Sequence, residues 1–330
     1  MSETDDLRQA LVRELERAGV VSNPLVRDAF LAVPRERFLP GRPLEQVYRD
    51  EAILTRRDPS GAPMSSSSQP AMMALMLERL QLAPGQRVLE IGAGTGYNAA
   101  VLSTIVGPGR VVSVELDPAT AAEARAALAG YDVEVVTADG RQGWAAGAPY
   151  DRMIVTASAE TVPRAWYDQL AKGGILVVPL RTGGGQAQAI PVLRKDGAGF
   201  RSVSVLCGSF MPLRGGTGAR RAPSIPPRGR ARIRPFRARS PRWTLALYLA
   251  LEAPEGRYVD GGAGYGIAAE QSLALVTDVG ICAWGGPEAE EILDRLLEEW
   301  RARGRPGERN LVLAITYDGT RPRVEHAWQE

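Results

Sequence analysis

The sequence predicts an α/β protein with a doubly wound, mostly parallel sheet, followed by a small C-terminal α+β domain. From residue 87 onward, apolar strand-like runs alternate with helix-like runs, which is the pattern of strand–helix–strand units. A glycine-rich turn directly follows the first of these runs. Near residue 215 the composition changes to an Arg-, Pro- and Gly-rich stretch, and a second set of short strand-like runs follows. These observations favour two domains.

The predicted elements divide the chain into four parts. We expect N-terminal helices and a substrate loop in 1–85, the sheet in 86–214, an Arg/Pro-rich linker in 215–242 and the C-terminal domain in 243–330. Helices are predicted at 5–20, 25–33, 70–80, 97–105, 118–129, 162–171 and 287–303. Strands are predicted at 87–91, 111–115, 133–136, 151–156, 174–179, 187–194, 230–237, 243–251, 272–278, 280–284 and 310–317.

Composition narrows the function classes. No run of 18 apolar residues is present, and the acidic start lacks an apolar signal core, so we expect a cytoplasmic protein without a membrane span. Cys207 and Cys282 lie in apolar surroundings and are expected to be reduced core residues. No metal-ligand spacing occurs, so no metal is expected. The single histidine, His326, argues against most general-base and triad chemistry.

The run Val88–Tyr97 is the most informative motif. An apolar strand leads into G-x-G-x-G, and a helix pattern follows at once. Glu115 ends a second apolar strand, where its carboxylate suits the hydroxyl groups of a ribose. The loop lacks both the G-x-G-x-x-G spacing of dinucleotide sites and the Lys-Ser/Thr of a P-loop. The sequence therefore favours S-adenosylmethionine as the cofactor and S-adenosylhomocysteine as its product, with a purely structural turn as the alternative.

With these residues in place, the first 214 positions resemble the protein-L-isoaspartate O-methyltransferase family. The matching segments are 33–40, 48–50, Ser68-Gln69-Pro70, 88–96 with Glu115, 138–143, 148–151, 155–157, 169–174 and 210–213. The resemblance implies a class I S-adenosylmethionine-dependent methyltransferase fold, Rossmann-like in topology. It also implies transfer of a methyl group to the side-chain carboxylate of aspartate or isoaspartate in a peptide or protein.

The motifs and the resemblance together assign the site. The expected cofactor residues are Ser67, Gln69, Glu90, Gly92, Gly94, Gly96, Glu115, Leu116, Asp139, Gly140 and Thr156. The expected substrate residues are Ser66, Arg56, Arg57, Ala157, Met211, Pro212 and Leu213. Ser68 is the expected catalytic residue and would hydrogen-bond the acceptor carboxylate rather than act as a nucleophile. The four consecutive serines at 65–68 leave its register open by one residue.

Each assignment has a plainer alternative. Ser68 could only cap a helix, Asp139 could only form a turn before Gly140, and Glu115 could be an ordinary acid at a strand end. Arg56 and Arg57 could belong to a solvated loop. Met211 and Leu213 could be core residues.

The sequence departs from the family pattern in two places. The approach to the serines, 53–64, is longer and richer in charge, and the chain continues for more than a hundred residues past 214. Extended family members that resemble this chain methylate an aspartate of ribosomally made precursor peptides, and the ester closes to an aspartimide. We therefore expect tailoring of a precursor peptide, already macrocyclised by a partner enzyme, with the C-terminal domain recognising the substrate.

Three alternatives remain. The first is a general repair enzyme that acts on isoaspartate in many proteins. The second is a nucleic-acid methyltransferase, which the arginine-rich stretch suggests but the net charge of +2 disfavours. The third is a non-catalytic binding protein with a methyltransferase fold.

Overall fold

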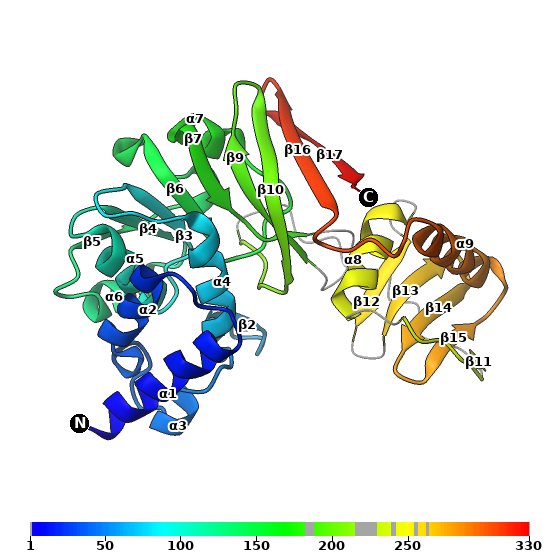
Figure 1. Ribbon diagram of the computed structural model, residues 1–330, viewed down its shortest axis with the longest axis horizontal. Coiled ribbons are helices and arrows are strands. Elements are labelled where there is room, and N and C mark those ends of the chain that lie inside the picture. The colour runs from blue at the N-terminus through cyan, green and yellow to red at the C-terminus, as the bar shows by residue number, and fades with distance from the viewer. Residues whose placement is uncertain are drawn as a thin grey trace.

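A mixed sheet of ten strands forms the centre of the molecule in the computed structural model (Figure 1). The structure describes residues 2–181, 188–214, 230–238, 242–253, 257–261 and 264–329. The strand order is β17-β16-β10-β9-β7-β6-β3-β4-β5, and β8 pairs with β9. The strands are β3 (Val88–Ile91), β4 (Val111–Glu115), β5 (Val133–Thr137), β6 (Tyr150–Val155), β7 (Leu170–Val177), β8 (Leu180–Arg181), β9 (Gln188–Lys195), β10 (Gly199–Gly208), β16 (Leu311–Asp318) and β17 (Arg321–Trp328).

The five strands from β3 to β7 are parallel to one another, and their order determines where the ligand crevice lies. β4 and β5 lie on one side of β3, whereas β6 and β7 lie on the other. The connections therefore diverge at β3 and β6, and a crevice opens there at the carboxyl ends of these two strands. This arrangement confirms the predicted doubly wound, mostly parallel sheet of a class I methyltransferase fold.

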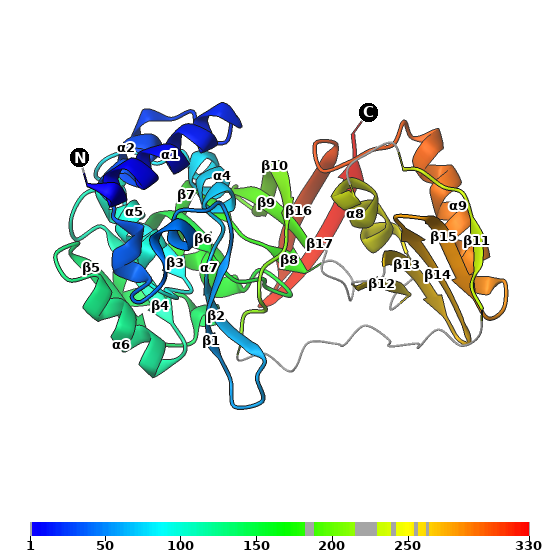
Figure 2. The same ribbon diagram turned by 90° about the horizontal axis from the view of Figure 1, so that it is seen from below.

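Helices cover both faces of the sheet. One apolar cluster joins the sheet to α1 (Glu3–Arg17), α2 (Pro24–Ala32), α4 (Pro70–Leu80), α5 (Tyr97–Val106) and α6 (Pro118–Ala127). On the other face, α7 (Arg164–Gln169) buries Trp166 completely. Short elements join these layers: η1 (Arg35–Phe38), α3 (Leu44–Val47), η2 (Gly140–Gln142) and η3 (Ala145–Gly147). A separate hairpin, β1 (Ile53–Arg57) and β2 (Pro63–Ser67), projects beyond this body (Figure 2).

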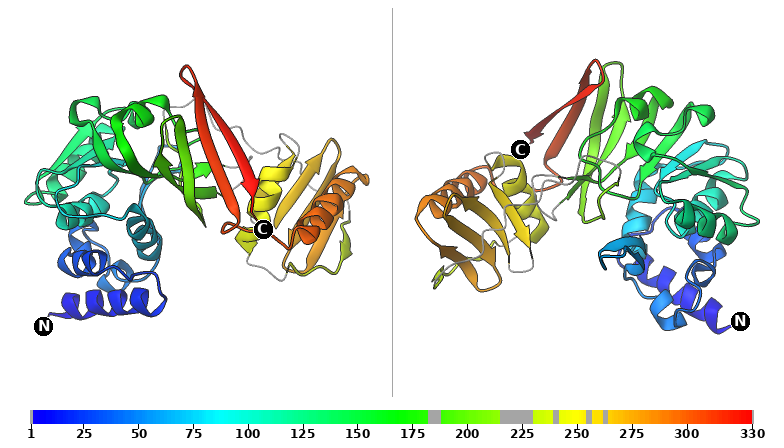
Figure 3. Two further views of the ribbon diagram at one scale, coloured as in Figure 1. Left: turned by 45° about the horizontal axis from the view of Figure 1, so that its top comes forward. Right: turned by 180° about the vertical axis from the view of Figure 1, so that it is seen from behind.

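A second, antiparallel sheet lies apart from the first (Figure 3). Its strands are β11 (Arg232–Arg234), β12 (Tyr258–Gly261), β13 (Gly264–Ala269), β14 (Ser272–Thr277) and β15 (Gly280–Trp284). One face is covered by α9 (Glu288–Ala302), which buries Leu293, Leu297 and Trp300. Of the expected linker, 215–229 and 239–241 lie outside the described residues.

Two expectations for the C-terminal region were wrong. Residues 243–251 do not form a strand but belong to the helix α8 (Arg242–Glu252), which contacts β10 on one side and β12 on the other. Because Thr244 to Ala250 are all buried, this helix has no polar face that would show a helical period. The strand at 310–317 also pairs differently. It is β16, and it joins β10 of the large sheet, where Phe200 faces Ile315.

Both cysteines are free, as expected. Within the described part of the chain, no helix is long and apolar enough to cross a membrane.

Candidate active site

The glycine loop between β3 and α5 is shaped by backbone conformation and by close contact. Gly92, Gly94 and Gly96 have φ values of +99°, +53° and +88°, in the region that favours glycine. A Cβ built on Gly92 would lie 2.5 Å from Oγ1 of Thr156, which follows β6. That Oγ1 donates to the carbonyl oxygen of Gly92 at 2.7 Å and lies 3.1 Å from that of Ile91. Thr156 therefore fastens the loop across the crevice.

Glu115 secures the other side of the same loop. Its Oε2 accepts from the backbone N–H of Gly94 at 3.1 Å, and its Oε1 accepts from the N–H of Asp117 at 3.1 Å. The next residue, Leu116, exposes 40% of its surface beside this carboxylate and lines the cleft. The arrangement combines a fixed acid with an exposed apolar surface, which suits the ribose and the flat ring of an adenosine.

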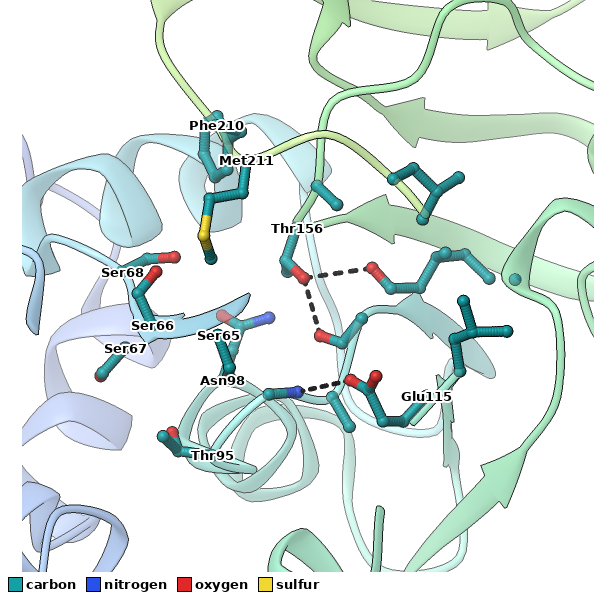
Figure 4. A pocket seen from close by; sticks show the side chains of 18 of the residues that line it. Ser65, Ser66, Ser67, Ser68, Thr95, Asn98, Glu115, Thr156, Phe210 and Met211 are labelled. Carbon is teal, nitrogen blue, oxygen red and sulfur yellow. Dashed lines mark hydrogen bonds between the residues drawn. The ribbon is translucent and has the colours of Figure 1, made fainter. Parts of the chain in front are cut away.

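A cleft with about 1040 Å³ of open space lies over the loop. It is lined by Met64 to Ser68, the glycine loop, Leu116, Gly140, Thr156, Ala157 and the segment from Phe210 to Arg214 (Figure 4). In Figure 4, Ser66 and Ser68 lie together on the wall opposite Thr156, below Met211, whereas Ser67 points away. The structure thus brings the expected cofactor loop and two of the serines to one cavity.

The segment from Phe210 to Leu213 forms a strap at the edge of the cleft. The N–H of Ser158 donates to the carbonyl oxygen of Met211 at 2.8 Å, and the N–H of Leu213 donates to that of Ser158 at 2.8 Å. Arg214 donates to the carbonyl oxygen of Met64 on the β1–β2 hairpin. The strap is therefore bonded on both sides of the opening.

Ser68 precedes α4 without capping it. The N-cap residue of α4 is Gln69, and no side-chain cap hydrogen bond is present there. Ser67 is 3% exposed and accepts from Nη2 of Arg35 at 3.3 Å, so its hydroxyl faces the protein interior. Among the four serines, Ser68 is therefore a cleft residue next to a helix start, and Ser67 is not placed to meet a ligand with its hydroxyl.

Several expected site residues do not line the cleft. Gln69 is exposed and donates to Asp50 at 2.8 Å, while Gly96 packs on Leu128. Asp139 accepts from Arg141 through both carboxylate oxygens, and this hydrogen bonding lowers the pKa of Asp139. Gly140, beside it, does line the cleft, where Ile91 leaves no room for a Cβ.

The two arginines of the hairpin also point elsewhere. Nη1 of Arg56 lies 3.0 Å from the carboxylate of Asp117 and 3.0 Å from Oγ1 of Thr120, and Nη2 lies 3.7 Å from Glu123. Arg57 donates to the carbonyl oxygen of Gly61 within the hairpin. Arg56 instead lines a neighbouring cavity, which shares Ser65, Gly94 and Thr95 with the main cleft.

Glu90 lies beneath the cleft rather than in its wall. Its carboxylate is fully buried, accepts from Nδ2 of Asn98 at 2.7 Å and accepts from the hydroxyl of Ser113. Burial raises the pKa of Glu90 to about 7, against the lowering effect of these two hydrogen bonds. The residue therefore orients other groups rather than meeting solvent itself.

Asn98 is the main site residue that the sequence analysis missed. It lines the cleft with 8% exposure, and its Oδ1 is buried without a hydrogen-bond partner in the described structure. An unpaired buried acceptor is costly, and a ligand donor would satisfy it. The available signal was a polar side chain two residues after the last loop glycine, in an otherwise apolar helix start.

Comparisons with known proteins agree with this geometry. Residues 6–217 match the family described as Protein-L-isoaspartate(D-aspartate) O-methyltransferase. The protein-L-isoaspartate O-methyltransferase of Roseiflexus castenholzii is 44% identical over 212 residues, which covers 63% of this chain and 92% of the relative. The enzyme of that name from Ignicoccus hospitalis is 38% identical over 213 residues, covering 63% of this chain and 98% of the relative.

Two solved structures are also similar. One, a protein-L-isoaspartate O-methyltransferase, has a TM-score of 0.62 and 28% identity and covers 96% of this chain and 99% of that chain. The other, from Plasmodium falciparum, is described provisionally as such an enzyme in complex with S-adenosyl-L-homocysteine. Its TM-score is 0.50 at 20% identity, with 63% of this chain and 99% of that chain covered, so it supports the fold alone. The first likeness covers 96% of this chain and so extends over the C-terminal region, whereas the two relatives named above each cover 63% of it.

Proposed function

The chain belongs to the protein-L-isoaspartate O-methyltransferase family of S-adenosylmethionine-dependent carboxyl methyltransferases, and from this premise we propose that it methylates isoaspartate in proteins as a repair enzyme. The observation that carries the proposal is the cleft that joins the glycine loop to Ser68 and the strap. The chain offers an adenosine cradle at one end of this cleft and hydroxyl groups at the other. An isoaspartyl carboxylate would lie between them.

The residues of the cleft fit S-adenosylmethionine. Because Gly92 and Gly140 have no side chain, Thr156 and Ile91 can pack directly against the backbone under the cleft, and the carboxylate of Glu115 is held beside the loop. We assign the ribose hydroxyls to Glu115, the adenine ring to Leu116 and Gly140, and the α-ammonium to the unpaired Oδ1 of Asn98. Glu90 would fix the amide of Asn98 by accepting from its Nδ2, which leaves Oδ1 toward the ligand.

Bound S-adenosylmethionine supplies a sulfonium methyl group, which a carboxylate oxygen can accept while the C–S bond breaks and its electron pair stays on sulfur. Ser68 would donate its hydroxyl hydrogen to the acceptor carboxylate and hold it in line. The acceptor is already ionised at neutral pH, so no base has to remove a proton. This agrees with the lining of the cleft, whose described residues include no histidine, cysteine or lysine. Positioning and exclusion of water by the strap would supply the catalysis.

The conversion of the methyl ester to a succinimide would need no residue of this chain. In the methyl ester, the backbone nitrogen of the next residue attacks the ester carbonyl, methanol leaves and a five-membered succinimide forms. Hydrolysis of that ring returns part of the product to aspartate, which is repair.

Tailoring of a ribosomally made precursor peptide stays a prediction. Two features of the sequence led to this prediction: the extension past residue 214 and the unusual segment 53–64 before the serines. A solved structure described simply as a protein-L-isoaspartate O-methyltransferase covers 96% of this chain. An extension of this kind therefore does not favour a dedicated precursor peptide over general repair.

The test uses two peptides of identical sequence, one with isoaspartate and one with aspartate. We expect the protein and S-adenosylmethionine to add the mass of one methylene to the isoaspartyl peptide only. Ser68→Ala should lower kcat about 10- to 100-fold, because a hydrogen bond to a charged group is lost, with unchanged affinity for S-adenosylhomocysteine. Ser60→Ala, at the hairpin tip, is the control. Methylation of the aspartyl peptide alone, or of tRNA or DNA alone, would overturn the proposal, as would failure to bind S-adenosylhomocysteine.

A further inference from the structure

Arg35 is a buried cation that the proposed chemistry does not use. It begins η1, is 0% exposed and donates almost entirely to backbone carbonyl groups. Nη1 donates to the carbonyl oxygens of Val47 at 2.9 Å and Arg49 at 3.2 Å. Nη2 donates to the carbonyl oxygen of Ser68 at 3.0 Å and to Oγ of Ser67 at 3.3 Å. One guanidinium therefore connects the loop after α3 to the two serines before α4.

Asp50, in that same loop, holds the opposite side of Ser68. Its Oδ2 accepts from Nε2 of Gln69 at 2.8 Å, and its Oδ1 accepts from the N–H of Ala71 at 2.7 Å. The first free amide of α4 is thereby occupied by Asp50 rather than left open toward the cleft. Arg35 thus forms hydrogen bonds with residues 67 and 68, whereas Asp50 forms hydrogen bonds with residues 69 and 71.

The hairpin before this segment ends its pairing at Ser67, which faces Ile53, so the β-ladder does not hold Ser68 itself. The pairing of β1 with β2 shifts between Leu54 and Arg56 and again between Arg56 and Arg57. Four consecutive serines have no difference in side chain that would favour one register over the next. A one-residue slip would turn Ser67 toward the cleft and Ser68 into the interior, where it could not meet an acceptor.

We propose that Arg35 and Asp50 form a clamp that sets which serine faces the acceptor carboxylate, with Arg35 as the positioning residue for Ser68. The inference rests on the proposed function of Ser68. A planar guanidinium that reaches several carbonyl oxygens at once is not replaced by the single ammonium of lysine. Lysine keeps the charge and much of the volume. Arg35→Lys therefore removes the planar guanidinium and its several directed hydrogen bonds with little change in packing.

The matched control is Arg152→Lys. Arg152 on β6 also donates to backbone carbonyl groups, those of Leu80 and Gln81 at the end of α4, and burial lowers its pKa as it does that of Arg35. It holds the far end of the same helix, away from Ser68. Any loss that comes only from replacing an arginine that donates to backbone carbonyl groups should appear in both variants.

The experiment measures methylation of the isoaspartyl peptide as a double-mutant cycle. We expect Arg35→Lys to lower kcat about 10- to 100-fold, no more than Ser68→Ala does, because it displaces the hydroxyl that Ser68→Ala removes, with unchanged affinity for S-adenosylhomocysteine. In the Ser68→Ala background the same substitution should cost less than about threefold, because the hydroxyl that it positions is gone. Asp50→Asn, which keeps one acceptor, should give a smaller loss with the same dependence on Ser68. Arg152→Lys should leave kcat unchanged in both backgrounds.

Backbone hydrogen exchange provides a readout that does not need activity. We expect faster exchange of the amides from Ser67 to Met72 in Arg35→Lys than in Arg152→Lys. An equal loss of kcat with and without Ser68, or unchanged exchange in this segment, would overturn the clamp. A wild-type protein that is inactive on the isoaspartyl peptide would instead refute the proposed function, and the exchange experiment would still decide whether the clamp exists.

Discussion

The hydroxyl of Thr156 occupies the space that a side chain on Gly92 would need. Oγ1 donates to the carbonyl oxygen of Gly92 at 2.7 Å and would lie 2.5 Å from a Cβ on that residue. Gly92 follows β3, and Thr156 follows β6, its parallel neighbour. The contact therefore joins the two strands where their connections diverge, and it fixes the floor of the cleft.

Gly92→Ala should abolish tight cofactor binding. The added methyl group would push Thr156 away, and the φ of +99° would strain any residue other than glycine by about 1–3 kcal/mol. We expect the Kd for S-adenosylhomocysteine in calorimetry to rise at least about tenfold. Gly85→Ala is the control, because Gly85 has a φ of +84° but no atom within 4 Å of the position that a Cβ would take. It should lower stability without changing the Kd, and equal Kd values for both variants would contradict the role of the Thr156 contact.

Glu115→Gln should weaken binding for two reasons. The amide group would turn an N–H toward either Gly94 or Asp117, whose own N–H groups now donate to the carboxylate, and the ribose would lose its charged acceptor. A hydrogen bond to a charged group is worth about 1.5–3 kcal/mol, so the Kd for S-adenosylhomocysteine should rise about 10- to 100-fold. Glu134→Gln, on the exposed side of β5, should have no effect. An unchanged Kd for Glu115→Gln would rule out the ribose assignment.

The sequence predicted where the glycine loop, Glu115 and Thr156 lie because each stands at the end of a buried strand, and the ends of parallel strands meet. Their contacts with a ligand stay predictions. The sequence did not allow prediction of Asn98, whose importance depends on a missing partner in three dimensions. The clamp on Ser68 was also hidden, since Arg35 and Ser68 are 33 residues apart and no local pattern links them. Similarly, α8 is buried on all sides and shows no amphipathic period, and the pairing of β16 with β10 spans more than a hundred residues.

The burial of Glu90 predicts a pH dependence of stability. Its pKa of about 7 in the fold exceeds the value of about 4.3 of an unfolded glutamate, so the folded protein holds a proton that the unfolded chain releases. The stabilising contribution of Glu90 should be fully present below about pH 4.3 and should be lost as the pH rises to about 7, which lowers the free energy of unfolding by about 4 kcal/mol. Denaturant unfolding at several pH values measures this change.

Glu90→Gln isolates that contribution. The amide stays neutral, accepts from Asn98 with its oxygen and donates to Ser113, whose hydroxyl can rotate to accept. We expect this variant to be more stable than the wild type at pH 8, with the difference shrinking as the pH falls toward 4.3. A difference that does not vary with pH would show that Glu90 titrates normally.

After the second sheet, the chain adds β16 and β17 to the large sheet. We therefore expect truncation after Arg214 to destabilise the catalytic domain. This cut removes β16, whose Leu311, Leu313 and Ile315 are at most 3% exposed, and with it the bond from the N–H of Leu313 to Oγ of Ser202 at 2.8 Å. Three buried aliphatic side chains correspond to about 5 kcal/mol. We expect a lower Tm and exposure of the β10 edge, seen as aggregation in scattering.

Replacing residues 215–309 by a short Gly/Ser linker keeps the strands of the large sheet and, of the structural contacts to that sheet, removes those of α8 with β10 and β16, so a Tm measurement must accompany the test of substrate recognition. β10 and β16 are antiparallel, so the end of one and the start of the other lie on the same side of the sheet, and β16 and β17 are kept. We propose that the removed unit, with α9 and the second sheet, binds protein substrates. Arg232 and Arg234 pair with Glu290 there, which disfavours nucleic acid as the ligand. The linker variant should then bind S-adenosylhomocysteine normally and methylate a short isoaspartyl peptide with an unchanged KM. Its KM for an isoaspartate-containing folded protein should rise, and an unchanged KM for that substrate would show that the unit has another role.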